Sequence, residues 1–103
     1  MLVASGVIGV TRDGDNGPEA QFRRAFERMI EILEENELTI RDVAEMTTYH
    51  VDLGKLGRDF IRVKDEYLPE TPYPAWTAIG VDRLFLDSAL IEIRFIAALP
   101  PGE

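Results

Sequence analysis

Two stretches near the C-terminus decide the fold: residues 73–81, YPAWTAIGV, and residues 90–98, LIEIRFIAA. Both are rich in β-branched and other apolar side chains, which is typical of buried strands. The segment between them, residues 82–89, contains Asp82, Asp87 and Ser88, which are residue types common in turns. The sequence therefore predicts two strands, and the short connection favours an antiparallel pair.

The second of these strands has two very different faces. Side chains alternate along a strand, so one face is fully apolar and carries Ile91, Ile93, Phe95 and Ala97. The other face carries Glu92 and Arg94 between Leu90 and Ile96. Ionised side chains rarely lie on an apolar sheet face without a partner or a ligand. Two interpretations stay open: a ligand site at Glu92, or a salt bridge between Glu92 and Arg94 at a subunit interface.

The rest of the chain supplies the other elements of an α+β fold. Residues 1–10 and 42–51 are predicted strands, and helices are predicted from Pro18 to Asn36 and from Arg58 to Leu68. The order strand, helix, strand, helix, strand, strand predicts a mixed four-stranded sheet with two helices on one face. One domain spanning residues 1–103 is expected. The tail, residues 100–103, is expected to lie beyond all regular structure.

The sheet face opposite the helices would still carry Leu90, Ile96 and Ala98. An apolar patch of this kind is seldom left in contact with water. We therefore expect the chain to assemble through this face, and three sheets closing into a central barrel would cover it.

Composition limits the classes of function. A net charge of −8 and a pI near 4.6 argue against a nucleic-acid partner bound through its phosphates. The chain has no cysteine, so it has no disulfide, no thiol nucleophile and no cysteine-based metal site. His50 is the only histidine and has no metal-binding companion, so a structural role is expected. No cofactor and no metal are predicted.

No targeting signal is expected from the sequence. No apolar run approaches the ~20 residues that cross a bilayer. The start, MLVA, lacks the basic residues and the long apolar stretch of a signal peptide. We expect no membrane partner and a cytoplasmic location.

Several short motifs resemble those of one known family: Pro74-Ala75, Thr77, Arg83-Leu84, Ile91-Glu92-Ile93 and Ile96-Ala97, with Ser5-Gly6 and the segment from Asp42-Val43 to Tyr49 at matching spacings upstream. Together they resemble the RidA/YjgF/YER057c/UK114 family of reactive intermediate deaminases. The resemblance implies a chorismate-mutase-like α+β fold and a homotrimer. It also implies hydrolysis of enamines and imines to keto acids and ammonia in clefts between subunits.

The resemblance assigns roles to particular residues. Glu92 matches the glutamate that orients or activates the hydrolytic water, and it is the predicted catalytic residue. The backbone at Gly6 would line the ligand cleft. Trp76, Thr77 and Ala78 follow the Pro-Ala motif and are the further predicted ligand-binding residues.

Two departures from the family pattern leave two classes of function open. Deaminating members carry an arginine directly after Pro-Ala to hold the substrate carboxylate, and here that residue is Trp76, which has one neutral N–H donor. The family also usually begins with an extra strand and a cleft tyrosine, and this sequence begins later. The first class is a hydrolase for small imines or enamines, with Arg94 replacing the missing anion anchor beside Trp76. The second is a non-catalytic trimer that binds a small metabolite, such as a carboxylate or an imine, in the same clefts.

Overall fold

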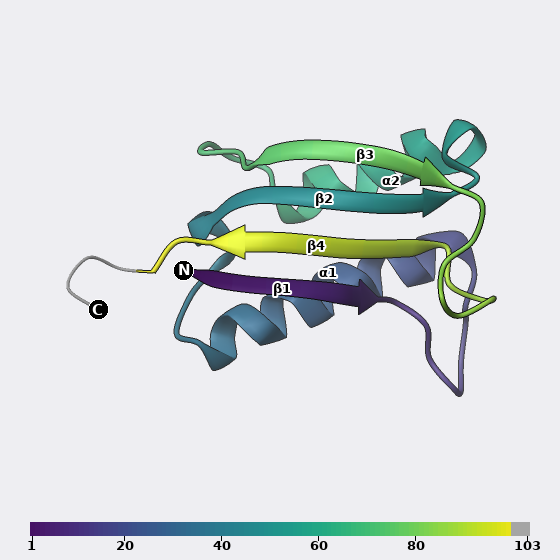
Figure 1. The fold of residues 1–103 in the computed structure, drawn as a ribbon, viewed down its shortest axis with the longest axis horizontal. Helices are drawn as coiled ribbons and strands as arrows, with labels where there is room; N and C mark the ends of the chain where they lie inside the picture. The colour runs from purple at the N-terminus through teal and green to yellow at the C-terminus, as the bar shows by residue number, and fades with distance from the viewer. Residues whose placement is uncertain (100–103) are drawn as a thin grey trace.

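The computed structural model describes residues 1–99 and consists of one sheet with two helices on one of its faces (Figure 1). The predicted tail, residues 100–103, lies outside the described residues. The elements follow in the predicted order: β1 (Leu2–Ile8), α1 (Pro18–Glu35), a short 3₁₀ helix η1 (Ile40–Asp42), β2 (Val43–Val51), α2 (Leu53–Tyr67), β3 (Ala75–Val81) and β4 (Ile91–Ala97). The predicted α+β class, with a mixed four-stranded sheet and two helices, is confirmed.

The pairing of the strands differs from the prediction. The sheet order is β1-β4-β2-β3, and β4 is antiparallel to both of its neighbours, β1 and β2. β3 pairs in parallel with β2, so the predicted antiparallel pair of β3 and β4 is wrong. Parallel strands need a crossover connection, and α2 supplies it between β2 and β3. The residues from 82 to 90 therefore pass over the end of β2 instead of closing a hairpin (Figure 1).

α1 begins and buries its side chains as the sequence indicates. Pro18 occupies the first turn, where its missing N–H costs nothing, and Glu19 complements the positive end of the helix dipole. The residues of the helix that face the sheet are fully buried: Phe22, Ala25, Phe26, Met29 and Leu33. The apolar stripe is therefore core, as predicted.

α2 begins five residues earlier than predicted, at Leu53 instead of Arg58. Gly54 and Gly57 suggested a flexible connection, since glycine in a helix interior costs about 1 kcal/mol relative to alanine. In the structure both glycines are helical. Burial of Phe60 and Val63 in the same helix offsets the low helix propensity of the two glycines.

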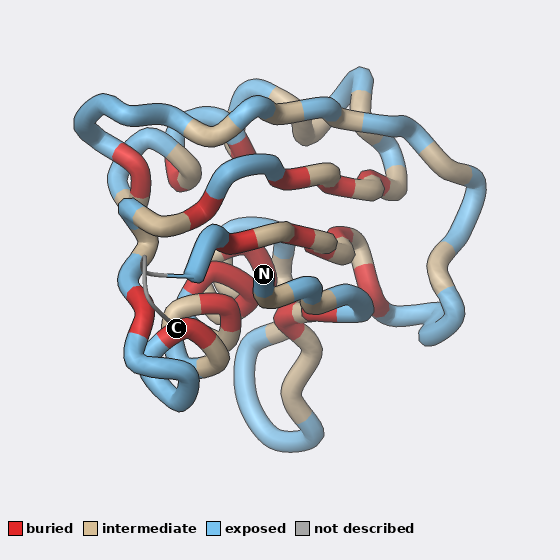
Figure 2. The backbone as a smooth tube through the Cα atoms, turned by 60° about the vertical axis from the view of Figure 1, so that its left-hand side comes forward, coloured by how far each residue is buried: buried red, intermediate tan, exposed pale blue. Residues whose placement is uncertain are grey.

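The core lies between the helices and the sheet, and Phe60 is at its centre. Its ring centroid lies 5.4 Å from that of Phe22, 5.6 Å from Phe26 and 4.6 Å from His50. Along β4, buried residues alternate with half-buried ones, as the change of colour in Figure 2 shows. This alternation confirms the predicted faces of β4, with Ile91, Ile93, Phe95 and Ala97 against the helices.

The opposite face of the sheet is open within residues 1–99. Val3 on β1 is 51% exposed and Ile79 on β3 is 39% exposed, although both are large apolar side chains. Ile96, opposite Val3, is only half-buried. Both helices lie on the other side of the sheet (Figure 1). Neither helix in this part of the chain is long and apolar enough to cross a membrane.

Candidate functional site

A hollow of about 250 Å³ brings together two of the predicted site residues, Gly6 and Glu92. It is formed where β1 and β4 meet the loop that precedes β4, and its lining residues are Gly6, Ile8, Leu84, Phe85, Leu86, Ala89 and Glu92. Glu92 is half-buried and lies opposite Ile8 of β1 and Tyr49 of β2. A single carboxylate therefore lies beside an otherwise apolar recess where the end of β1 meets the start of β4.

Gly6 belongs to an irregularity in β1. The register against β4 shifts between Ala4, which lies opposite Phe95, and Val7, which lies opposite Ile93. Gly6 has a φ of 72°, a left-handed conformation that glycine adopts without strain. A Cβ at this position would meet no atom within 4 Å, so the backbone conformation, not lack of space, favours glycine. The bulge leaves the Gly6 backbone on the wall of the hollow.

The loop that forms the other wall is anchored by Gln21, a residue that the sequence analysis missed. Gln21 is 1% exposed. Its Nε2 donates to the carbonyls of Asn16 and Ser88, each at 2.8 Å, and its Oε1 accepts from the Leu90 N–H at 2.9 Å. Gln21 lies four residues before Ala25 and so on the buried stripe of α1, where a polar side chain requires buried partners. This position was the signal that could have identified it.

Arg94 does not pair with Glu92 in the part of the chain that the structure describes. It lies opposite Thr47, and its Nη1 is 4.0 Å from Glu45 Oε1. Both members of this pair are substantially exposed, so the contact contributes little to stability. The alternative of a Glu92–Arg94 salt bridge concerned a subunit interface, and this pair is not formed within residues 1–99 of one chain.

Trp76 lies on the other face of the sheet from Glu92 and Arg94. Its Nε1 donates to Thr48 Oγ1 at 2.8 Å, and its ring lies 6.0 Å from Phe60 and 4.8 Å below Lys64 Nζ. The predicted proximity of Arg94 and Trp76 within one chain is wrong. It assumed that β3 and β4 are neighbours, whereas β2 separates them and Trp76 lies beside Met46, which faces the helices.

The remaining predicted residues divide between the two faces. Thr77 is exposed and lies beside Thr47, in the same row across the sheet as Arg94. Ala78 lies beside Thr48, whose side chain is fully buried against the helices. One chain therefore brings Gly6 and Glu92 together, places Thr77 and Arg94 on the open face with β2 between them, and places Trp76 and Ala78 on the face that the helices cover.

His50 lies in the core, as predicted. It is 2% exposed, and its Nε2 is 2.7 Å from Thr48 Oγ1. The Thr48 hydroxyl accepts from Trp76, so its own proton is available to His50 Nε2. This arrangement requires a neutral imidazole, and burial lowers the pKa of His50 to about 4.

The buried histidine predicts a specific loss of stability in acid. Because the pKa of His50 is lower in the folded chain than its ordinary 6.5, the unfolded chain binds more protons between these values. The free energy of unfolding should therefore fall as the pH is lowered from about 6.5 to 4, by on the order of 3 kcal/mol from this residue. Urea unfolding at pH 7 and pH 4.5, followed by circular dichroism, measures the change. His50→Gln should show a smaller difference between the two pH values, and an equal difference would contradict the assignment.

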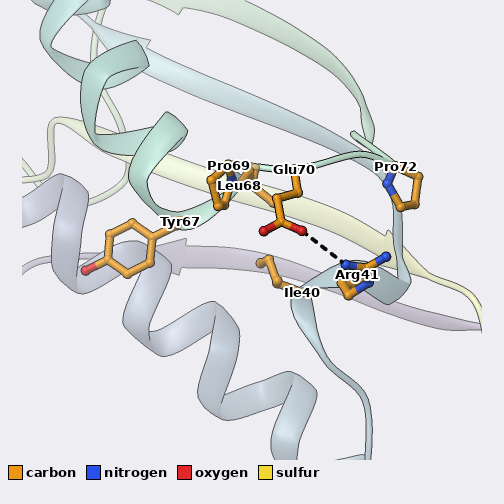
Figure 3. A pocket seen from close by; sticks show the side chains of 7 residues that line it. All are labelled: Ile40, Arg41, Tyr67, Leu68, Pro69, Glu70 and Pro72. Atoms are coloured by element: carbon orange, nitrogen blue, oxygen red, sulfur yellow. Dashed lines mark ion pairs between the residues drawn. The ribbon is translucent and has the colours of Figure 1, made fainter.

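A second hollow, of about 200 Å³, lies where the segment after α2 passes η1 (Figure 3). Its lining residues are Ile40, Arg41, Tyr67, Leu68, Pro69, Glu70 and Pro72. Glu70 points toward Arg41, with their charged atoms 3.6 Å apart, and both side chains are largely exposed. None of the predicted site residues lies in it. Among residues 1–99, no three His, Cys, Asp or Glu side chains are grouped to hold a metal ion.

The sequence and the fold both match known proteins. The family model described as Endoribonuclease L-PSP matches residues 1–99. The RutC family protein YjgH of Escherichia coli K12 is 34% identical in an alignment of 102 positions that covers 97% of this chain and 76% of that protein. A solved structure of protein YjgH superposes with a TM-score of 0.87 at 32% identity, over 97% of this chain and 77% of that chain. The structure of E. coli TdcF with bound serine gives a TM-score of 0.86 at 26% identity, over 95% and 80% of the two chains.

Proposed function

Because the chain belongs to the RidA/YjgF family, we propose that it binds a small molecule in the hollow beside Gly6 and Glu92. The observation that carries the proposal is the convergence of these two residues, one near each end of the sequence, on one recess. TdcF, a relative with the same fold, has been solved with bound serine, which supports a ligand of similar size. A net charge of −8 gives no support to binding of an RNA substrate, despite the family's description as an endoribonuclease.

The proposed functional unit is a homotrimer. Val3, Ile79 and Ile96 lie on the open face of the sheet, and contact between copies would remove them from water. A second copy would also be needed to bring a Trp76 near a Glu92, since one chain places them on opposite faces. Sedimentation velocity at micromolar concentration should give the mass of three chains. A stable monomer would contradict the proposed trimer and any role for a subunit interface in the site.

The reaction proposed for this site is hydrolysis of a small imine or enamine. Water attacks the carbon of the C=N bond while Glu92 accepts one of its protons. The proton passes to nitrogen, and the C–N bond of the resulting carbinolamine breaks to leave a carbonyl compound and ammonia. The balance is R₂C=NH + H₂O → R₂C=O + NH₃, and no cofactor takes part. The proposed location of this activity is the cytoplasm.

One observation favours a second candidate, a trimer that binds a metabolite without turning it over. Trp76 is held by Thr48 and Phe60 beneath α2, and the resemblance places it where deaminating members carry their carboxylate-binding arginine. Tryptophan cannot form the two charge-assisted hydrogen bonds of an arginine with a carboxylate. The recess beside Glu92 does not depend on this residue within one chain. Binding would therefore survive the substitution even if turnover were lost.

The same observation predicts weak activity on imino acids such as 2-aminoacrylate. Loss of hydrogen bonds to a charged carboxylate costs about 1.5–3 kcal/mol, which corresponds to a rate roughly ten- to a hundredfold lower. Release of pyruvate from 2-aminoacrylate, compared with an arginine-bearing relative under the same conditions, measures this. Equal rates would show that another group replaces the arginine.

A further inference from the structure

We infer that the hollow beside Glu92 selects small ligands that carry an apolar group and a neutral or cationic nitrogen, and that it rejects small carboxylates. This inference rests on the proposed function, because it concerns the same site. It differs from the imino-acid chemistry of the arginine-bearing members in the charge of the ligand. Three features of the recess support it.

The first feature is the lining. Five of its seven residues are apolar: Ile8, Leu84, Phe85, Leu86 and Ala89. Glu92 is the only ionisable side chain among the seven. A second carboxylate placed beside Glu92 would be repelled, and an ammonium or iminium group would be attracted. The apolar wall would hold a hydrocarbon substituent.

The second feature is that the arginines near the recess already have partners. Arg83 donates to the carbonyls of Leu84 and Phe85, each at 3.3 Å, and forms an ion pair with Asp87. Arg28 donates to the Ile8 carbonyl at 2.7 Å and to the Val10 carbonyl at 2.8 Å. Arg28 supports the wall at Ile8, whereas the more exposed Arg83 is occupied by the backbone of the loop and by Asp87.

Arg94 is also unsuited to hold an anion beside Glu92. Arg94 is two residues after Glu92 on β4, and its side chain lies against Glu45 of the neighbouring strand β2. It is not among the residues that line the hollow. Among residues 1–99, no positively charged side chain therefore lines the recess.

The third feature is the mouth of the recess. Phe85 is 95% exposed and Leu86 is 45% exposed, although exposed phenylalanine is uncommon. The loop that carries them is tied down by Gln21 through the Ser88 carbonyl and the Leu90 N–H. An anchored loop therefore presents two apolar side chains at the opening. The hollow, at about 250 Å³, is smaller than the ~300–1,000 Å³ typical of drug-sized ligands, so it suits a ligand of few atoms.

A comparison of probes with similar shape and different charge tests the inference. Isobutylamine, isobutanol and isobutyrate share one hydrocarbon group, and methylamine controls for attraction by charge alone. Each is titrated into the isotope-labelled full chain at physiological salt, and the amide signals of Gly6 and Ala89 report binding. The amide of Tyr67 reports the second hollow. Wild type and Glu92→Gln are compared.

Isobutylamine is expected to bind wild type at least about tenfold more tightly than isobutyrate, with methylamine much weaker than isobutylamine. In Glu92→Gln the difference between amine and carboxylate should shrink below about threefold, because the charge that separates them is gone. Isobutyrate that binds as tightly as the amine, or a preference that Glu92→Gln leaves unchanged, overturns the inference and leaves the proposed binding site intact. If no probe shifts the amide signals of Gly6 or Ala89, both the inference and the proposed function are overturned.

Discussion

Replacing Phe60 with alanine is expected to lower the free energy of unfolding by about 3–5 kcal/mol, the usual cost of deleting a buried aromatic ring. Phe60 is fully buried and stands between both helices and the sheet. Its ring contacts Phe22 edge to face, stacks near Phe26 and meets the His50 ring edge to face. These rings come from α1 and β2, so the cavity would loosen both helices against the strands.

Urea unfolding followed by circular dichroism measures the effect of Phe60→Ala. The matched control is Phe85→Ala, which removes the same ring from a side chain that is 95% exposed. That control should change the free energy of unfolding by no more than about 0.5 kcal/mol. Equal losses in the two variants would contradict the described core.

Glu92→Gln carries the largest expected effect on activity. If Glu92 moves the protons in imine hydrolysis, the nearly isosteric amide should lower kcat/KM by about 10²- to 10⁴-fold. Glutamine cannot accept a proton from water at neutral pH, although it retains the size of the side chain. The variant should keep the fold, because Glu92 is half-buried and no ion pair involving it is found within residues 1–99.

Release of ammonia from a small imine without a carboxylate group measures this effect. The matched control is Glu45→Gln, which changes a carboxylate on a neighbouring strand that is not part of the recess. Glu45→Gln should keep its activity within about threefold, because surface substitutions away from a site have small effects. Equal losses of activity in both variants would show that the net charge of the protein, not the position of Glu92, determines the rate.

Much of the fold could be predicted from the sequence, because it depends on local patterns. The alternation in β4 and the stripe in α1 each identify a buried face from neighbouring residues alone. Strand pairing depends on contacts between distant segments, and the sequence does not contain that information in local form. The turn residues between β3 and β4 suggested a hairpin, although α2 already supplied the crossover that makes β2 and β3 parallel neighbours.

The candidate site was also predicted only in part, because some of its contacts join segments that are distant in sequence. Gly6 and Glu92 were identified through motifs that resemble a family, and they do lie together. The expected proximity of Arg94 and Trp76 within one chain depended on the wrong strand pairing and is not found. Gln21 was missed because its role depends on three backbone groups from two loops that are distant in sequence.

A crystal structure with isobutylamine, at a concentration that saturates binding in solution, tests the central claim most directly. The claim is that the recess formed by Gly6, Glu92 and the anchored loop is the ligand site of this protein. Density for the amine is expected within hydrogen-bonding distance of the Glu92 carboxylate, with the isobutyl group against Ile8 and Leu84. Density only in the hollow between Tyr67 and Arg41, or on neither surface, would contradict the claim.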